Sequence, residues 1–145
     1  MFSKKVLIGT LIIAILNFAL GFLWYDILMG DFFPSMEGAT RAAPNFPAII
    51  LGILTFSYAF ARLFDLIQNA EETLMSQAIR FGLLVGLLTA VAYAFFQFGG
   101  MEIWSATHHV VDAIYNTIVA IISAIVLAKY YGPMPSRGEK DKGKT

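Results

Sequence analysis

The sequence predicts an all-α fold, an integral membrane four-helix bundle, and three observations support this fold class. Hydrophobic residues make up 58% of the 145-residue chain and charged residues only 14%, which is less charge than a soluble domain of this length normally carries. The hydrophobic residues gather in four segments, each near the ~20 residues with which a helix crosses the hydrocarbon core of a bilayer. Within these segments the apolar residues are continuous, without the alternation of a membrane β-barrel strand.

The four predicted helices are separated by short segments of polar or helix-breaking residues. The first break, 30–45, contains Gly, Pro and charged residues, which is typical of a loop. The break at 69–77 reads NAEETLMSQ and predicts a short acidic turn, and the third break opens with Gly99 and Gly100. After the bundle, the Gly-, Pro- and Lys-rich tail 132–145 predicts a disordered segment. The predicted helices are 5–29, 46–68, 80–98 and 106–131, within one transmembrane domain 1–131.

The distribution of Lys and Arg predicts that both chain termini lie in the cytoplasm. These residues lie near the N-terminus, on either side of the second break and near the C-terminus, and Arg41 is the only one in the first or third break. Positive charge marks the cytoplasmic side of a membrane protein. In this orientation Trp24, Tyr25 and Trp104 fall together at the outer interface, where aromatic belts are expected.

A stripe of small residues predicts where the third helix packs closely. Gly82, Gly86, Ala90 and Ala94 recur every four residues, a spacing that lets a second helix approach its backbone. The stripe favours helix packing within the chain. A seam between two copies is the alternative, because the same motif serves both purposes.

Two amide side chains are predicted to link the first and fourth helices. Asn17 and Asn116 lie near the midpoints of these helices. Lipid offers no hydrogen-bond partner at that depth, so we predict an interhelical hydrogen bond between them. Such a bond contributes roughly 0.6–2 kcal/mol.

A polar cluster at the outer end of the bundle raises the question of a metal site. It consists of Asp26, Glu102, His108, His109 and Asp112. Each histidine is three or four residues before Asp112, so imidazole and carboxylate share one helical face, and this ligand set suits zinc. The alternative, which we favour, is an ordinary hydrogen-bond cluster at the interface. A helix N-terminus stabilises an anion at Asp112, and no HExxH signature is present.

A second polar group lies near the cytoplasmic end of the second helix. Arg62 and Asp65 are three residues apart, so they can form an ion pair on one helical face. We expect the pair to seal the bundle interior or to contact phosphate headgroups. The alternative is a gate in a substrate path.

Two stretches resemble a family of small bacterial membrane proteins, domain of unknown function 1761. GFLWYDILMG at 21–30 is similar to the end of that family's first helix, and VVDAIYNTIVAIISAIVLAKYY at 110–131 is similar to its last helix. Ile27 and Phe33 depart from the family pattern, which often has Pro and Trp in these regions. The matching residues are Gly21, Trp24, Tyr25, Gly30, Asp112, Ala113 and Tyr115.

The resemblance implies four membrane crossings and a location in the bacterial cytoplasmic (inner) membrane, but no established activity. Asp112 belongs to the matching residues, whereas His108 and His109 lie outside them. We therefore expect Asp112 to have a structural role, tying the first and fourth helices together at the outer face.

The sequence contains few motifs that indicate a known catalytic or binding function. It has no glycine-rich phosphate loop, no serine–histidine–acid arrangement in one accessible place and no cysteine, so we expect neither enzymatic activity nor a cofactor. The zero net charge gives no attraction for nucleic acid.

We expect a non-enzymatic accessory or structural subunit that packs in the lipid bilayer as a homo-oligomer or in a larger membrane complex. The alternative is a small transporter or metal-binding membrane protein that uses the outer His/Asp cluster. A transporter should have a cavity joining the two polar groups. An accessory subunit should have a dry core and an apolar face for a partner.

Overall fold

The computed structural model describes residues 3–33, 45–69, 71–101 and 104–133, which form helices and short connections without any strand. Four helical spans in these ranges are long and apolar enough to cross a membrane. The predicted positions Arg41 and Glu102, and the tail beyond residue 133, lie outside the described residues. The spans are Lys4–Leu28, Phe46–Ile67, Leu74–Gly100 and Ala106–Tyr131.

Three helices begin at a side chain that caps the first free amide groups. Each capping oxygen accepts a hydrogen bond from the backbone nitrogen three residues later, at 3.2–3.3 Å, which satisfies a donor that has no partner within the helix. The helices and their capping residues are α1 (Lys4–Phe22) with Ser3, α2 (Phe46–Ile67) with Asn45, and α3 (Leu74–Gly86) with Thr73.

The third span begins at Leu74, earlier than the predicted start at Arg80. The polar residues that predicted a turn up to residue 77 form its first helical turn, because Gln77 is buried and binds the preceding connection. Its Nε2 donates to the carbonyl oxygens of Asn69 and Glu72 at 2.6 and 2.9 Å, and its Oε1 accepts from the Asn69 amide at 2.8 Å.

The first and third spans contain π-helical segments, which the hydrophobic pattern does not predict. In the first span, η1 (Leu23–Leu28) follows α1, and in the third, η2 (Leu87–Val91) separates α3 from α4 (Ala92–Gly100). The fourth span, α5 (Ala106–Tyr131), is uninterrupted. It is followed by Gly132, whose positive φ of 69° is readily accessible to glycine because glycine has no Cβ atom.

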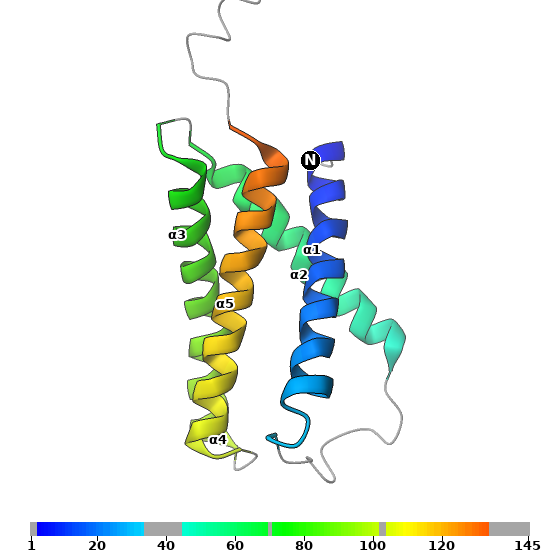
Figure 1. Cartoon of the computed structure of the whole chain (residues 1–145), viewed down its shortest axis with the longest axis vertical. Coiled ribbons are helices and arrows are strands. Elements are labelled where there is room, and N and C mark those ends of the chain that lie inside the picture. Colours follow the sequence, from blue (N-terminus) through cyan, green and yellow to red (C-terminus); the bar gives the residue numbers. More distant parts are fainter. Residues whose placement is uncertain (1–2, 34–44, 70, 102–103, 134–145) are drawn as a thin grey trace, which may run out of the picture.

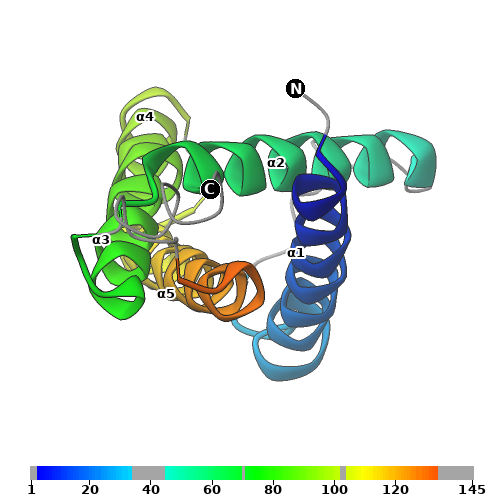
Figure 2. The same cartoon turned by 90° about the horizontal axis from the view of Figure 1, so that it is seen from above.

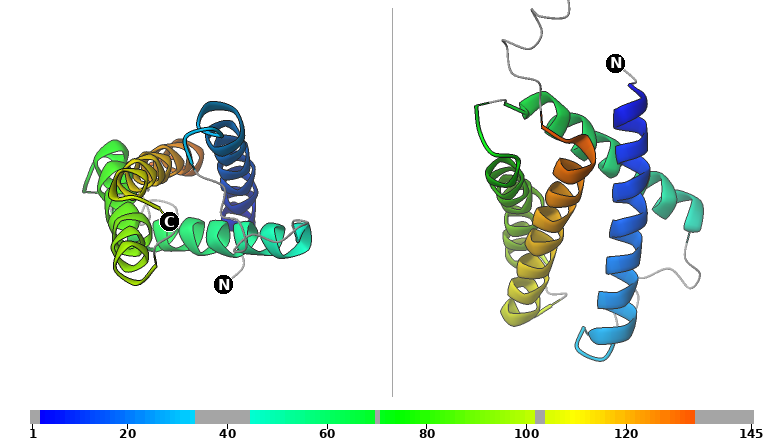
Figure 3. Two further views of the ribbon diagram at one scale, coloured as in Figure 1. Left: turned by 90° about the horizontal axis from the view of Figure 1, so that it is seen from below. Right: turned by 45° about the horizontal axis from the view of Figure 1, so that its top comes forward.

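The helices α1, α3 and α5 run along the long axis of the molecule, and α2 crosses them obliquely (Figure 1). Seen along that axis, α2 lies across α1, and its amino-terminal part extends beyond it (Figures 2 and 3). The start of α1 and the end of α5 lie at the same end of the bundle (Figure 1). We call the half that carries these ends the terminal half, and the opposite one the distal half.

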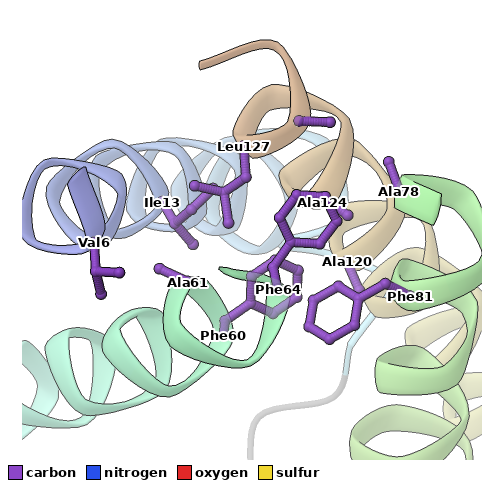
Figure 4. Close-up of a cluster of buried hydrophobic side chains, with 11 residues drawn as sticks. Val6, Ile13, Phe60, Ala61, Phe64, Ala78, Phe81, Ala120, Ala124 and Leu127 are labelled. Atoms are coloured by element: carbon purple, nitrogen blue, oxygen red, sulfur yellow. The ribbon is translucent and has the colours of Figure 1, made fainter. Parts of the chain in front are cut away.

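The terminal half contains a packed apolar core to which all four spans contribute (Figure 4). The rings of Phe60 and Phe64 lie 4.9 and 5.3 Å from that of Phe81. We call this set the terminal core. Its members are Val6, Ile13, Phe60, Ala61, Phe64, Ala78, Phe81, Ala120, Ala124, Leu127 and Ala128.

Two glycines of the predicted stripe allow α3 to approach α5 within the chain. A Cβ atom added to Gly82 would lie 2.4 Å from the Cα of Ile121, and one added to Gly86 would lie 2.7 Å from Cγ2 of Thr117. No larger residue fits at such distances. These glycines therefore serve packing within the chain.

Candidate functional site: a polar pocket in the distal half

The distal half contains a partly open cavity of about 490 Å³ between the four spans, within the 300–1,000 Å³ typical of small-molecule sites. We call it the distal pocket. Both π-helical segments contribute to its wall: Tyr25 comes from η1, and Thr89 and Ala90 come from η2. π-Helical turns occur frequently at functional sites. The irregular backbone of the first and third spans is therefore concentrated where the pocket lies.

A carboxylate and an amide on α5 organise one side of the distal pocket. The Tyr25 hydroxyl donates a hydrogen bond to Oδ1 of Asp112. Nδ2 of Asn116 lies 3.1 Å from the Tyr25 hydroxyl oxygen and 3.0 Å from the Asp112 carbonyl oxygen, to which it donates. Asp112 forms no ion pair with any Lys or Arg among the described residues. A negative charge at this site is thus hydrogen-bonded but has no cationic partner there.

A further hydrogen bond, between α1 and α5, lies deeper in the pocket. The Ser123 hydroxyl donates to Oδ1 of Asn17 at 3.2 Å. The predicted hydrogen bond between Asn17 and Asn116 is wrong, since each amide binds a different partner. The two helices are antiparallel, so the level of Asn17 on α1 corresponds to Ser123 on α5. Asn116 instead lies at the level of Tyr25.

The aromatic residues of the family-like motifs meet at the pocket wall. Tyr115 stacks on Trp24 with ring centroids 4.3 Å apart and planes inclined by 2°, and its edge-to-face contact with Tyr25 spans 5.8 Å. The Tyr115 hydroxyl and Trp24 Nε1 are buried without a hydrogen-bond partner in the described part of the chain. Tyr93 and Phe56 also line the pocket. Among the described residues, four aromatic side chains therefore line the pocket, and Trp24 supports one of them from behind.

The remaining family-like residues have different positions. Gly21 lines the pocket, with open space where a Cβ atom would lie. At Gly30, an added Cβ would lie 3.2 Å from the Asp26 carbonyl oxygen. Ala113 is buried on another side of α5, toward α4.

The two predicted metal-ligating histidines have separate environments. Nδ1 of His108 lies 2.7 Å from the Ser105 hydroxyl, and Nε2 lies 3.1 Å from the Phe32 carbonyl oxygen. His109 is buried between Trp104 and Phe98, at ring distances of 5.6 and 6.0 Å.

No group of three His, Cys, Asp or Glu residues suited to a metal ion occurs among the described residues. Asp26 is exposed on η1. Glu102, the remaining candidate ligand, is not among the described residues. A metal site that includes it therefore stays a prediction.

The predicted pair at the terminal end is part of a larger ion-pair cluster. Asp65 contacts Arg62 at 2.8 Å and Lys5 at 3.3 Å. Lys5 Nζ also donates to Gln68 Oε1 at 3.1 Å and lies 4.2 Å from the centre of the Tyr131 ring. The cluster joins α1, α2 and α5. The terminal core lies between it and the distal pocket, so the cavity does not join the two polar groups.

Several pocket residues were not singled out from the sequence. Thr89 and Ser123 are hydroxyl residues within apolar spans, and that contrast is a usable signal. Ser123 would also follow from pairing α1 and α5 as antiparallel helices through Asn17. Tyr93 and Phe56 carry no such signal, because aromatic residues are common throughout this chain.

The fold and the pocket define a class of protein: an all-helical chain with four membrane-length spans and a polar pocket in one half. No family model, curated protein or solved structure matches the chain. The resemblance to domain of unknown function 1761 therefore stays a prediction, and functional inference depends on the pocket itself.

Proposed function

We propose that the protein spans the bacterial cytoplasmic membrane four times and binds a small solute in the distal pocket, as a solute-binding membrane protein or as a small transporter in a state that is closed toward the terminal end. The pocket, with a carboxylate inside an apolar bundle, is the observation that carries this proposal. Ionisable groups at membrane depth are costly and usually mark functional sites. Here Asp112 lines a cavity of about 490 Å³.

The charge distribution supports an orientation in which the distal pocket faces the outside. Lys4, Lys5, Arg62, Arg80 and Lys129 all belong to the terminal half, and the described residues of the distal half contain no Lys or Arg. Positive residues favour the cytoplasmic side. Both termini would then be cytoplasmic, and solute would enter from the outer side.

The terminal half supplies the closure that a solute-binding membrane protein needs. Phe64, Leu127 and Ala124 are fully buried in the terminal core, and the Lys5–Asp65–Arg62 contacts lie beyond it. Solute in the distal pocket would be separated from the cytoplasm by packed side chains. Release to that side would require the terminal core to open.

The proposal is tested by the reactivity of introduced cysteines, because the native chain has none. In membrane vesicles with the outer face accessible, a Thr89→Cys variant should react with a hydrophilic methanethiosulfonate reagent. The neighbouring Leu88→Cys variant is the matched control: Leu88 is 75% exposed in the isolated chain but does not line the pocket, so lipid should protect it. Equal reactivity of the two, or an unreactive Thr89→Cys variant, would contradict a water-filled pocket.

The same chemistry tests the orientation. A cysteine at Glu37 should react with an impermeant thiol reagent added outside intact spheroplasts, and one at Ser136 should react only after lysis. The reverse pattern would place the distal pocket on the cytoplasmic side.

A separate observation favours the accessory-subunit function. A groove of about 600 Å³ runs between α4 and α5, with mostly apolar walls that include the small residues Ala94, Ala106 and Ala113. Small residues let a helix from another chain approach closely. In this function, a second copy of the chain occupies the groove. An Ala94→Trp variant should then lose the dimer in chemical cross-linking, whereas a wild type that never cross-links would contradict it.

A further inference from the structure

We propose that the distal pocket selects small organic cations, such as amines and quaternary ammonium ions, with Asp112 as their counter-ion. This inference rests on the proposed function and specifies the chemical class of the solute. Three features of the pocket support it: its charge, its aromatic wall and its size.

The ionisable side chains of the pocket wall favour a positively charged ligand. Among the described residues that line the pocket, Asp112 is the only ionisable acid or base apart from tyrosine hydroxyls, and none of them is Lys, Arg, His or Glu. The hydrogen-bond donor to its carboxylate, the Tyr25 hydroxyl, is neutral. A half-buried carboxylate in an apolar bundle is partly desolvated, and an opposite charge offsets that cost. A bound cation supplies that charge, whereas a bound anion would add repulsion.

The aromatic residues give the pocket a second means of attracting a cation. Tyr25, Phe56, Tyr93 and Tyr115 line it together with Asp112, and the faces of aromatic rings attract ammonium groups by their negative electrostatic potential. The stacking of Tyr115 on Trp24, at a centroid distance of 4.3 Å, fixes one of these rings. A wall that is already ordered loses little conformational entropy when ligand binds.

The size of the pocket indicates an organic cation. A bare metal ion takes several ligand oxygens in contact at 2–3 Å, whereas a cavity of about 490 Å³ holds a whole organic molecule. Beyond Asp112, Asn17 and Ser123 form a neutral polar patch. This patch can bind a hydroxyl or carbonyl group of the same ligand. The preferred solute thus has an ammonium group at one end and a neutral polar group at the other.

The inference is tested with two probes of the same shape that differ in charge. These are choline and 3,3-dimethylbutan-1-ol, in which carbon replaces the ammonium nitrogen; benzyltrimethylammonium serves as a larger cation. Binding to the purified full chain in lipid nanodiscs is followed by tryptophan fluorescence, because Trp24 contacts the pocket wall. We expect both cations to bind saturably, and choline to bind at least about tenfold more tightly than its isostere, as expected for a desolvated charge pair.

Two variants test whether Asp112 is responsible for the preference for choline over its neutral isostere. The Asp112→Asn variant should lose the preference for choline, while the Asp26→Asn variant should retain it, because Asp26 is exposed outside the pocket. The inference is wrong if choline and the isostere bind equally, if no cation binds at millimolar concentrations, or if Asp112→Asn keeps the selectivity. The comparison of probes in the wild type decides the question even if a variant does not fold.

The failure of this inference is distinguishable from failure of the proposed function. Reaction of the Thr89→Cys variant with the thiol reagent shows that the pocket contains water, and this result does not depend on the charge of the solute. A reactive cysteine without selectivity for choline would reject only the organic cation. An unreactive cysteine would reject the pocket as a binding site from the outside.

Discussion

The two halves of this bundle are built from the same four spans but in different ways. In the terminal half, Phe64, Leu127 and Ala124 are fully buried, and the helices are regular. In the distal half, both π-helical segments and the polar side chains surround a cavity. The difference shows that similar hydrophobicity along a span does not determine packing. The shape and polarity of the facing side chains decide whether the helices form a dry core or a pocket.

The largest effect should come from filling the close contact between α3 and α5. In a Gly82→Leu variant, the added side chain would meet the Ile121 backbone 2.4 Å away, and backbone cannot yield as a flexible side chain can. Overpacking typically costs 1–3 kcal/mol and sometimes more, and we expect loss of the folded monomer in size-exclusion chromatography. Gly99→Leu is the matched control, because nothing lies within 4 Å of a Cβ there. Survival of a stable Gly82→Leu protein would refute this packing.

Two phenylalanines on α2, one in each half, allow the packing of the two halves to be compared by mutation. Phe64 is 0% exposed in the terminal core, and Phe56 is 40% exposed at the distal pocket. Phe64→Ala should lower the free energy of unfolding by about 3 kcal/mol through the cavity that it leaves, whereas Phe56→Ala should cost less than about 1 kcal/mol. Unfolding in detergent titrations measures both. Equal losses of unfolding free energy in the two variants would mean that the two halves are packed alike.

The smallest effect on stability is expected at Asp112. An Asp112→Asn variant keeps an oxygen that can accept the hydrogen bond from Tyr25 and removes a charge without an ionic partner in the described structure. We expect its thermal unfolding temperature to be unchanged or slightly higher than that of the wild type, as is common when a functional group is removed. A destabilisation as large as that of Phe64→Ala would make Asp112 a structural residue and remove the main distinction between the halves.

Much of the fold follows from the sequence, because long apolar segments and their breaks are strong signals. The second and fourth spans, Phe46–Ile67 and Ala106–Tyr131, lie close to their predicted limits. The start of the third span was missed because Gln77 is polar in sequence but buried by bonds to the preceding connection. Local composition cannot reveal such a tertiary contact.

The candidate site was predictable only in part. Tyr25, Asp112 and Asn116 stand out as polar or aromatic residues in the first and fourth spans, and they do lie together. The π-helical segments leave no recognisable pattern, and they change which residues face inward. Thr89 stands out as a hydroxyl residue in an apolar span, but its position in the pocket wall required the three-dimensional structure.

The hydrogen bonds that join the first span to α5 at two levels also have a consequence for the evolution of chain length. Asn17 binds Ser123, and Tyr25 binds Asp112, so the first span is fastened to its neighbour at two levels. One residue inserted into a helix shifts everything after it by about 1.5 Å and turns it by about 100°. An insertion or deletion within 18–24 would therefore break one fastening whenever it preserved the other. Insertions and deletions should therefore be rare in that short interval.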